Sequence, residues 1–359
     1  MSVTKNNDLP SLPIDEKISW LFKQNEEHSK KFLEQQLIRR FYRSNHPTEI
    51  CAFKCMDGRI HIPLVTHTPL GIIQPFRNLA GKFDLGWPYL GEVLNQWVDY
   101  SISRGRQCLV LVTYHYSQGN NEHRGCAGFH YNKEASFKFT TDFKEQFERM
   151  FGKNNQIVFP VIMGFETDGD SLILHGEDPQ NILDVATLPM AVSDDDLISK
   201  LNELYPSIPK RVIDDILPLV KGNIEHVAEI KAANRPILDS EHREWILGVG
   251  RGFDWLHEPN TALIIGPYSP NLSEPIKIAA KIIKSNMDAG RISNDGFVML
   301  ASSPYREMGA DRQRAIEKAR FIKGFAQEVI SSEFPELQDK MKPMAVILDL
   351  NTRKLQEIK

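Results

Sequence analysis

Residues 107–127, QCLVLVTYHYSQGNNEHRGCA, decide the fold class of this chain. The run QCLVLVTY at its start is continuously apolar, which is typical of a strand buried on both faces of a parallel sheet. A polar loop rich in Gly and Asn follows. Similar strand-length runs alternate with helical patterns from residue 47 onward. We therefore predict an α/β fold, with a mostly parallel β-sheet flanked by helices.

The second half of the chain repeats this order of elements without repeating the sequence. We predict strand, helix, strand, long helix and strand at 261–266, 274–286, 296–301, 311–330 and 344–350. The same order runs from residue 71 to residue 164, so the second half is expected to be a degenerate copy of the first. No convincing strand is predicted before the glycine-rich GVGRG at 248–252.

Three parts follow from this pattern: an N-terminal helical arm at 1–46, a first domain at 47–190 and a second domain at 191–359. The arm is amphipathic between residues 14 and 42. Two interpretations stay open for it, packing on the core of its own chain or reaching onto a partner subunit.

Composition excludes several classes of protein. The 359 residues are 41% hydrophobic and 25% charged, with 43 Lys+Arg against 47 Asp+Glu and a net charge of −4. This balance gives no electrostatic case for binding nucleic acid or an anionic membrane, and no apolar run approaches the roughly 20 residues that span a bilayer. Only 4 cysteines and no apolar leader favour a cytoplasmic, reduced protein, in which clustered cysteines more often bind metal than form disulfides.

Two of the cysteines fall at the ends of predicted elements. Cys55 ends a strand, and Cys126 follows the loop after the strand at 107–114. His115 comes immediately beyond that strand, and His123 lies three residues before Cys126. The carboxyl ends of adjacent parallel strands converge, so both thiols and one of these imidazoles can meet. Two thiolates and one imidazole leave a fourth tetrahedral position open, as in catalytic zinc sites.

The remaining cysteines and two charged residues complete this reading. Cys51 and Cys108 lie inside strands and are expected to be core residues. Asp57 and Arg59 follow Cys55 in one turn, where a carboxylate and a guanidinium can pair beside the metal. Geometry favours His115 as the third ligand, because a strand end holds a side chain more rigidly than a loop; His123 is the alternative.

The pattern resembles the β-carbonic anhydrases. Residues 55–59, CMDGR, match their C-x-D-x-R signature, and residues 123–126, HRGC, match their H-x-x-C. The divergent carboxysome shell carbonic anhydrase branch is more similar, because YHYS at 114–117 and HRGCA at 123–127 follow its Y-H-aromatic-S and H-x-G-C-A patterns. The resemblance implies Zn²⁺ bound by Cys55, His115 and Cys126, and an active domain packed against a degenerate copy that has lost the metal site.

It also implies reversible, zinc-dependent hydration of CO2 to bicarbonate. A zinc hydroxide would attack CO2 while Asp57 orients it, and Arg59 would keep Asp57 ionised and away from the metal. In some family members the Asp instead ligates zinc in a closed, inactive state, and both states stay open here. A hydrolase of CS2 or COS and a catalytically silent zinc-binding scaffold are the alternatives. A homodimer or higher homo-oligomer is expected, whereas the short N-terminus does not favour association with a carboxysome shell.

Overall fold

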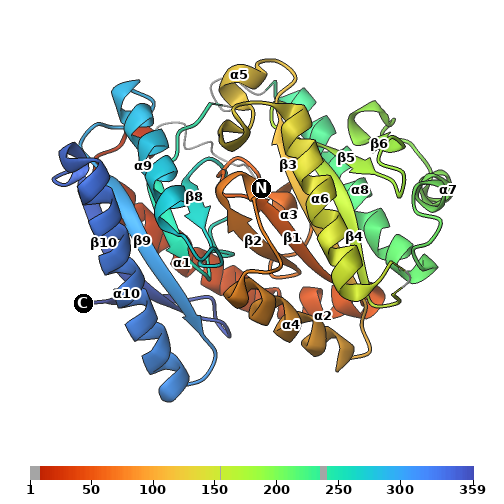
Figure 1. Cartoon of the computed structure of the whole chain (residues 1–359), viewed down its shortest axis with the longest axis horizontal. Helices are drawn as coiled ribbons and strands as arrows, with labels where there is room; N and C mark the ends of the chain where they lie inside the picture. The colour runs from red at the N-terminus through yellow and green to blue at the C-terminus, as the bar shows by residue number, and fades with distance from the viewer. Residues whose placement is uncertain (1–8, 154, 235–240) are drawn as a thin grey trace.

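Two β-sheets, each covered by helices, form the framework of the protein (Figure 1). The computed structural model describes residues 9–153, 155–234 and 241–359. The first sheet has 6 strands in the order β2-β1-β3-β4-β5-β6. Its strands are β1 (Glu49–Cys55), β2 (Ile73–Asn78), β3 (Cys108–Tyr116), β4 (Val158–Glu166), β5 (Ser171–His175) and β6 (Ile182–Asp184). The strands β1 to β4 pair in parallel, and β5 and β6 add an antiparallel edge.

The second sheet has 5 strands in the order β11-β10-β9-β7-β8. Its strands are β7 (Ile246–Gly250), β8 (Ala262–Ile265), β9 (Phe297–Tyr305), β10 (Met341–Asp349) and β11 (Leu355–Ile358). Here too the first four strands pair in parallel and the last is antiparallel. Numbered within its own half, the second sheet carries its strands in the order 2-1-3-4-5, and the first sheet has the same order with a sixth strand beside the fifth. The α/β fold with a degenerate second copy is therefore confirmed.

The structure corrects the prediction at two strands. Residues 246–250 form β7, so the prediction that no strand leads into GVGRG was wrong. This strand is only 5 residues long and holds two glycines, which weakens its pattern. The strand β3 runs to Tyr116, so His115 lies within it rather than beyond it.

The alternation of side chains along β3 explains how helices cover both faces of the first sheet. All 9 residues of β3 are buried. Val110 and Val112 pack with Phe143 of α6, whereas Leu109 belongs to the larger core on the other face. Figure 1 shows α6 crossing the first sheet and α10 crossing the second at equivalent places. The longer helices are α1 (Ile14–Glu34), α2 (Gln36–Asn45), α4 (Pro88–Ile102), α6 (Lys133–Phe151), α7 (Asp194–Leu204), α8 (Lys210–Ala233), α9 (Ser273–Asp288) and α10 (Ala310–Glu333).

Short helical segments complete the structure. They are α3 (Ile62–Val65), α5 (Asn121–Arg124), η1 (Leu9–Ser11), η2 (Leu79–Gly81), η3 (Ala127–Phe129), η4 (Val185–Thr187) and η6 (Pro335–Leu337). The helix α8 contacts β5, η4 and α3. That the second domain begins at residue 191 stays a prediction. No helix in the described ranges has both the length and the hydropathy needed to cross a bilayer.

The N-terminal helix α1 packs on its own chain. Asn25 donates to the backbone oxygen of Arg353 at 2.9 Å, and the rings of Trp20 and Trp245 meet edge to face. On α2, by contrast, Leu37 and Phe41 are 73% and 71% exposed. Contact of this arm with a partner subunit stays a prediction.

The second half of the chain closes over the turn that follows β1. Asn260 donates its backbone N–H to the oxygen of Gly58 at 2.8 Å, and Ile264 donates to Met56 at 3.0 Å. A Cβ on Gly58 would lie 2.7 Å from the backbone oxygen of Ala262. Glycine in CMDGR is therefore required by the close approach of β8.

Candidate functional site

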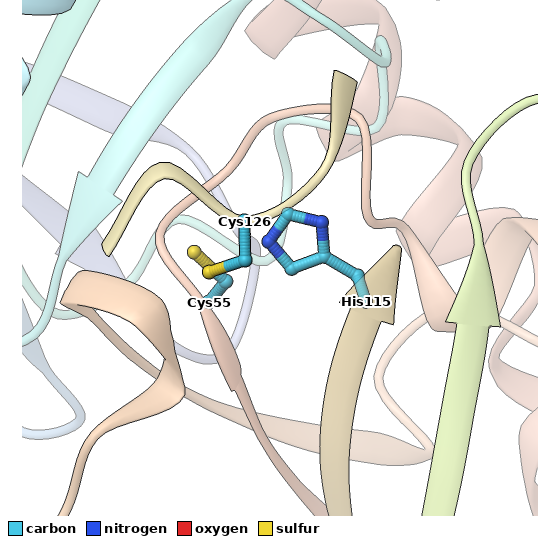
Figure 2. A group of neighbouring side chains, drawn as sticks. All are labelled: Cys55, His115 and Cys126. Atoms are coloured by element: carbon cyan, nitrogen blue, oxygen red, sulfur yellow. The ribbon is translucent and has the colours of Figure 1, made fainter. Parts of the chain in front are cut away.

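Cys55, His115 and Cys126 meet at the carboxyl end of the first sheet. Cys55 is the last residue of β1, His115 lies near the end of the adjacent parallel strand β3, and Cys126 caps η3. Each offers one ligand atom, and these atoms lie within 4.8 Å of one another. Figure 2 shows the imidazole of His115 pointing toward the two thiols. The structure thus brings together the three side chains that the sequence singled out.

The surroundings of these side chains fit a bound metal ion. Cys55, His115 and Cys126 are 7%, 3% and 3% exposed. Neither ring nitrogen of His115 makes a hydrogen bond of normal geometry with a described residue. Leaving a buried polar group unsatisfied is costly, and a metal ion on the ring would remove that cost. Two sulfurs and one nitrogen are a donor set that Zn²⁺ accepts, with a fourth position left for water.

Contact between the two thiols shifts their pKa values in opposite directions. The hydrogen bond from Cys126 lowers the pKa of Cys55 well below its ordinary value, although burial acts in the opposite direction. The imidazole of His115 lowers the pKa of Cys55 further. The same contact with Cys55, together with burial, raises the pKa of Cys126. Cys55 is therefore the thiol that more readily becomes a thiolate, the form in which cysteine binds a metal ion.

His123, the alternative ligand, lies in the short helix α5. Its side chain is outside the part of the chain that the structure describes, so the choice between His115 and His123 stays a prediction. The other two cysteines, Cys51 and Cys108, are fully buried among apolar side chains of the core, as predicted.

Asp57 and Arg59 form a bidentate ion pair beside the three ligands. Arg59 donates from Nε to Oδ1 of Asp57 at 3.0 Å and from Nη2 to Oδ2 at 2.6 Å. Its backbone N–H donates to the same Oδ1 at 2.9 Å. Oδ2 of Asp57 also lies 3.9 Å from Nε2 of His115. The carboxylate therefore faces the position where a metal ion would sit.

This ion pair stays charged in spite of its burial. Burial alone would raise the pKa of Asp57, but the positive charge of Arg59 holds it well below its usual range. Burial acts against the charge of Arg59 as well, and Asp57 more than offsets it by raising the pKa of the guanidinium. Asp57 is consequently an acceptor of hydrogen bonds and never a donor at neutral pH.

The second half of the chain contributes two further residues that the sequence did not reveal. Nη2 of Arg59 lies 3.1 Å from Nε2 of His242, and Nδ1 of His242 lies 2.9 Å from Glu244. Arg59 can only donate, so His242 accepts at Nε2 and donates at Nδ1 to Glu244. Glu244 also accepts from the backbone N–H of Gly58 at 3.3 Å. Both residues precede the short strand β7 and belong to no recognisable motif.

Comparisons with known proteins give one matching family model and several similar curated proteins. Residues 46–220 match the family model described as "Carboxysome Shell Carbonic Anhydrase, catalytic domain". The chain is similar to a protein named "Carboxysome shell carbonic anhydrase" from Parasynechococcus marenigrum (strain WH8102), with 24% identity over 57% of this chain and 40% of the relative. A protein of the same name from Halothiobacillus neapolitanus (strain ATCC 23641 / c2) is 23% identical over 77% of this chain and 61% of the relative.

A third protein with that name, from Prochlorococcus marinus (strain MIT 9313), is 22% identical over 64% of this chain and 50% of the relative. The chain thus spans about half the length of the curated relatives that it matches.

Proposed function

Residues 46–220 belong to the carboxysome shell carbonic anhydrase family, and on that premise we propose that this chain is a zinc-dependent enzyme that interconverts CO2 and bicarbonate. The observation that carries the proposal is the buried Asp57–Arg59 pair, 3.9 Å from a strand-end histidine that lies beside two thiols. Bound by Cys55, His115 and Cys126, Zn²⁺ supplies Lewis-acid activation of water near neutral pH.

Asp57 positions the attacking water. Its two oxygens are held by Arg59, and Oδ2 keeps a lone pair on the side that faces His115. A carboxylate that can only accept fixes one O–H bond of the water toward itself, which turns an oxygen lone pair toward CO2. Addition of that oxygen to the carbon of CO2, with loss of one proton to solvent, gives bicarbonate.

Arg59 keeps Asp57 in this role, and His242 and Glu244 keep Arg59 in place. Without the guanidinium, the Asp57 carboxylate would be free to turn toward the metal ligands. The hydrogen bond to Nε2 of His242, itself fixed by Glu244, gives the arginine a second anchor on the opposite half of the chain. We assign His242 and Glu244 a positioning role on this ground.

The assembly and location are proposed on separate observations. The exposed Leu37, Ile38 and Phe41 on α2 support a homodimer or higher homo-oligomer, because exposed apolar side chains clustered on one helix favour a protein interface. All four cysteines are free, and two serve as thiolates, which supports a reducing, cytoplasmic location.

Zinc analysis paired with stopped-flow CO2 hydration tests the function. Wild type should bind one zinc at the cysteine site and accelerate hydration. Asp57→Ala should retain that zinc and lose the acceleration. His115→Ala should lose zinc, whereas His123→Ala should keep it. Wild-type protein with full zinc and no hydration activity would refute the enzyme assignment, and zinc loss in His123→Ala alone would refute the choice of His115.

A further inference from the structure

A second group of metal-ligating side chains lies away from the cysteine site, where α8 meets the loop after α3. His67, His226 and Glu229 each offer one ligand atom, and these atoms lie within 4.8 Å of one another. His226 is buried at 7% exposure, whereas His67 and Glu229 reach the surface. His226 and Glu229 are three residues apart on α8 and therefore share one face of the helix.

The backbone around this group is held rigidly. Asn223 of α8 donates to the backbone oxygens of Val65 at 3.0 Å and Asp170 at 2.9 Å, and it accepts from the backbone N–H of Leu172. One fully buried amide thus ties α8 both to the end of α3 and to the turn between β4 and β5. Ligands carried by such a frame are preorganised, because little chain entropy is lost when an ion binds.

Glycine at position 222 allows the close approach. A Cβ on Gly222 would lie 2.0 Å from the backbone oxygen of Thr66, so no other residue permits α8 to pack this tightly against the segment that carries His67. His67 itself adopts a φ of 47°, and its ring lies edge to face with the ring of His226, with 5.9 Å between the centroids.

Each imidazole has a carboxylate within hydrogen-bond distance of one ring nitrogen. Nε2 of His226 lies 3.1 Å from Asp170, and Nδ1 of His67 lies 3.2 Å from Glu225. Histidines that bind metals characteristically donate their other N–H to a carboxylate in this way. Each ring keeps one further nitrogen that can receive an ion, and on His67 this is Nε2, which lies 3.5 Å from Oε2 of Glu229.

The remaining spacing matches tetrahedral coordination. Nε2 of His67 and Oε2 of Glu229 are 3.5 Å apart. Two ligands at about 2.0–2.1 Å from a tetrahedral zinc ion lie about 3.3 Å from each other. A direct hydrogen bond would bring these atoms closer, so the observed separation suits an ion between them.

We propose that His67, His226 and Glu229 form a second metal site, which binds Zn²⁺ or a similar divalent transition metal. The two imidazole ligands disfavour Ca²⁺ and Mg²⁺ as the bound ion, because those ions select oxygen donors. The exposed side of the cluster leaves the fourth position to water. The bound ion links the loop after α3 to α8, and so restrains the segment that begins at the Asp57–Arg59 turn.

Metal binding to the holoprotein tests the site independently of CO2 hydration. Protein that carries its cysteine-bound zinc is titrated with Zn²⁺ by calorimetry, and in parallel with Co²⁺ for spectroscopy. The expected result is a second equivalent. The Co²⁺ that binds as this second metal ion should show visible d–d absorption without a thiolate charge-transfer band, because its ligands are imidazole and carboxylate.

Variants locate the second equivalent. His67→Asn removes the imidazole with a residue that tolerates a positive φ, and it should abolish the binding, as should Glu229→Gln. Asp170→Asn should weaken binding about 10–100-fold through the loss of the carboxylate behind His226. The matched control is His130→Asn, which changes another exposed histidine of positive φ, 51°, outside the cluster and should bind as wild type does.

Three outcomes would overturn the proposal. They are the absence of a second equivalent in wild type, an unchanged second equivalent in His67→Asn, and a thiolate band on the Co²⁺ that binds as this second metal ion. None of them bears on the carbonic anhydrase activity, which is measured separately.

Discussion

Removing the guanidinium of Arg59 should destabilise the folded chain strongly at neutral pH. The side chains of Arg59 and Asp57 are each 4% exposed, and Arg59 supplies three hydrogen bonds to the carboxylate. In Arg59→Ala two of these are lost, and a buried carboxylate is left without its counter-ion. Breaking a buried pair by removing one partner costs about 3–5 kcal/mol. We expect a loss of that size in the free energy of unfolding.

A double variant separates the cost of the unpaired buried carboxylate from the cost of the lost side-chain packing. Asp57→Asn combined with Arg59→Ala replaces the carboxylate with a neutral amide, and removing both members of a pair costs less than removing one. The double variant should therefore recover roughly 2 kcal/mol relative to Arg59→Ala, although neither variant hydrates CO2.

Urea unfolding at constant pH, with zinc content measured on the same samples, gives these values directly. A cost below about 1 kcal/mol for Arg59→Ala, or a double variant less stable than Arg59→Ala at equal zinc content, would refute the picture of a buried pair sustained by mutual charge.

Three further changes have defined outcomes. Gly58→Ala should lower the free energy of unfolding by about 1–3 kcal/mol in urea because its Cβ meets the backbone of β8, whereas Gly324→Ala, with no atom within 4 Å, should be neutral or slightly stabilising. Glu244→Gln should slow CO2 hydration about tenfold in stopped-flow measurements, because His242 loses the charged acceptor that holds it. Zinc content should stay unchanged. An unchanged rate would contradict the positioning role. Burial lowers the pKa of His28 to about 4, so between about pH 6.5 and pH 4 the unfolded chain binds a proton that the folded chain does not. The free energy of unfolding should therefore fall as the pH drops through this range. In urea unfolding at pH 7 and pH 5, His28→Gln should lose less stability than wild type, and an equal loss in both proteins would contradict this prediction.

The sequence predicted those parts of the fold and site that depend on local patterns. The apolar run of β3 could be recognised in the sequence because a strand buried on both faces contains few polar residues. Cys55 and Cys126 could be placed at one sheet edge because parallel strands end together. The strand β7 was missed because its two glycines and 5-residue length leave little periodic signal.

His242 and Glu244 lay beyond sequence reasoning for a different physical reason. They reach the site only because the segment before β7 lies against the turn after β1. No spacing within the chain encodes that contact. The sequence placed Gly58 in a turn, but it did not show why glycine is needed there. A Cβ at this position would lie 2.7 Å from the backbone of β8, which is also a contact between the two halves of the chain.

The second half of the chain holds the turn that lies beside the three candidate ligands. The strand β7 ends at Gly250 where β1 ends at Cys55, and no cysteine follows Cys126 in the chain, so the second sheet has no thiol ligands. It still covers Gly58, supplies Glu244 to the turn and places His242 on Arg59. The two sheets thus contribute different things to one site: the first carries the three candidate ligands, and the second holds the Asp57–Arg59 turn.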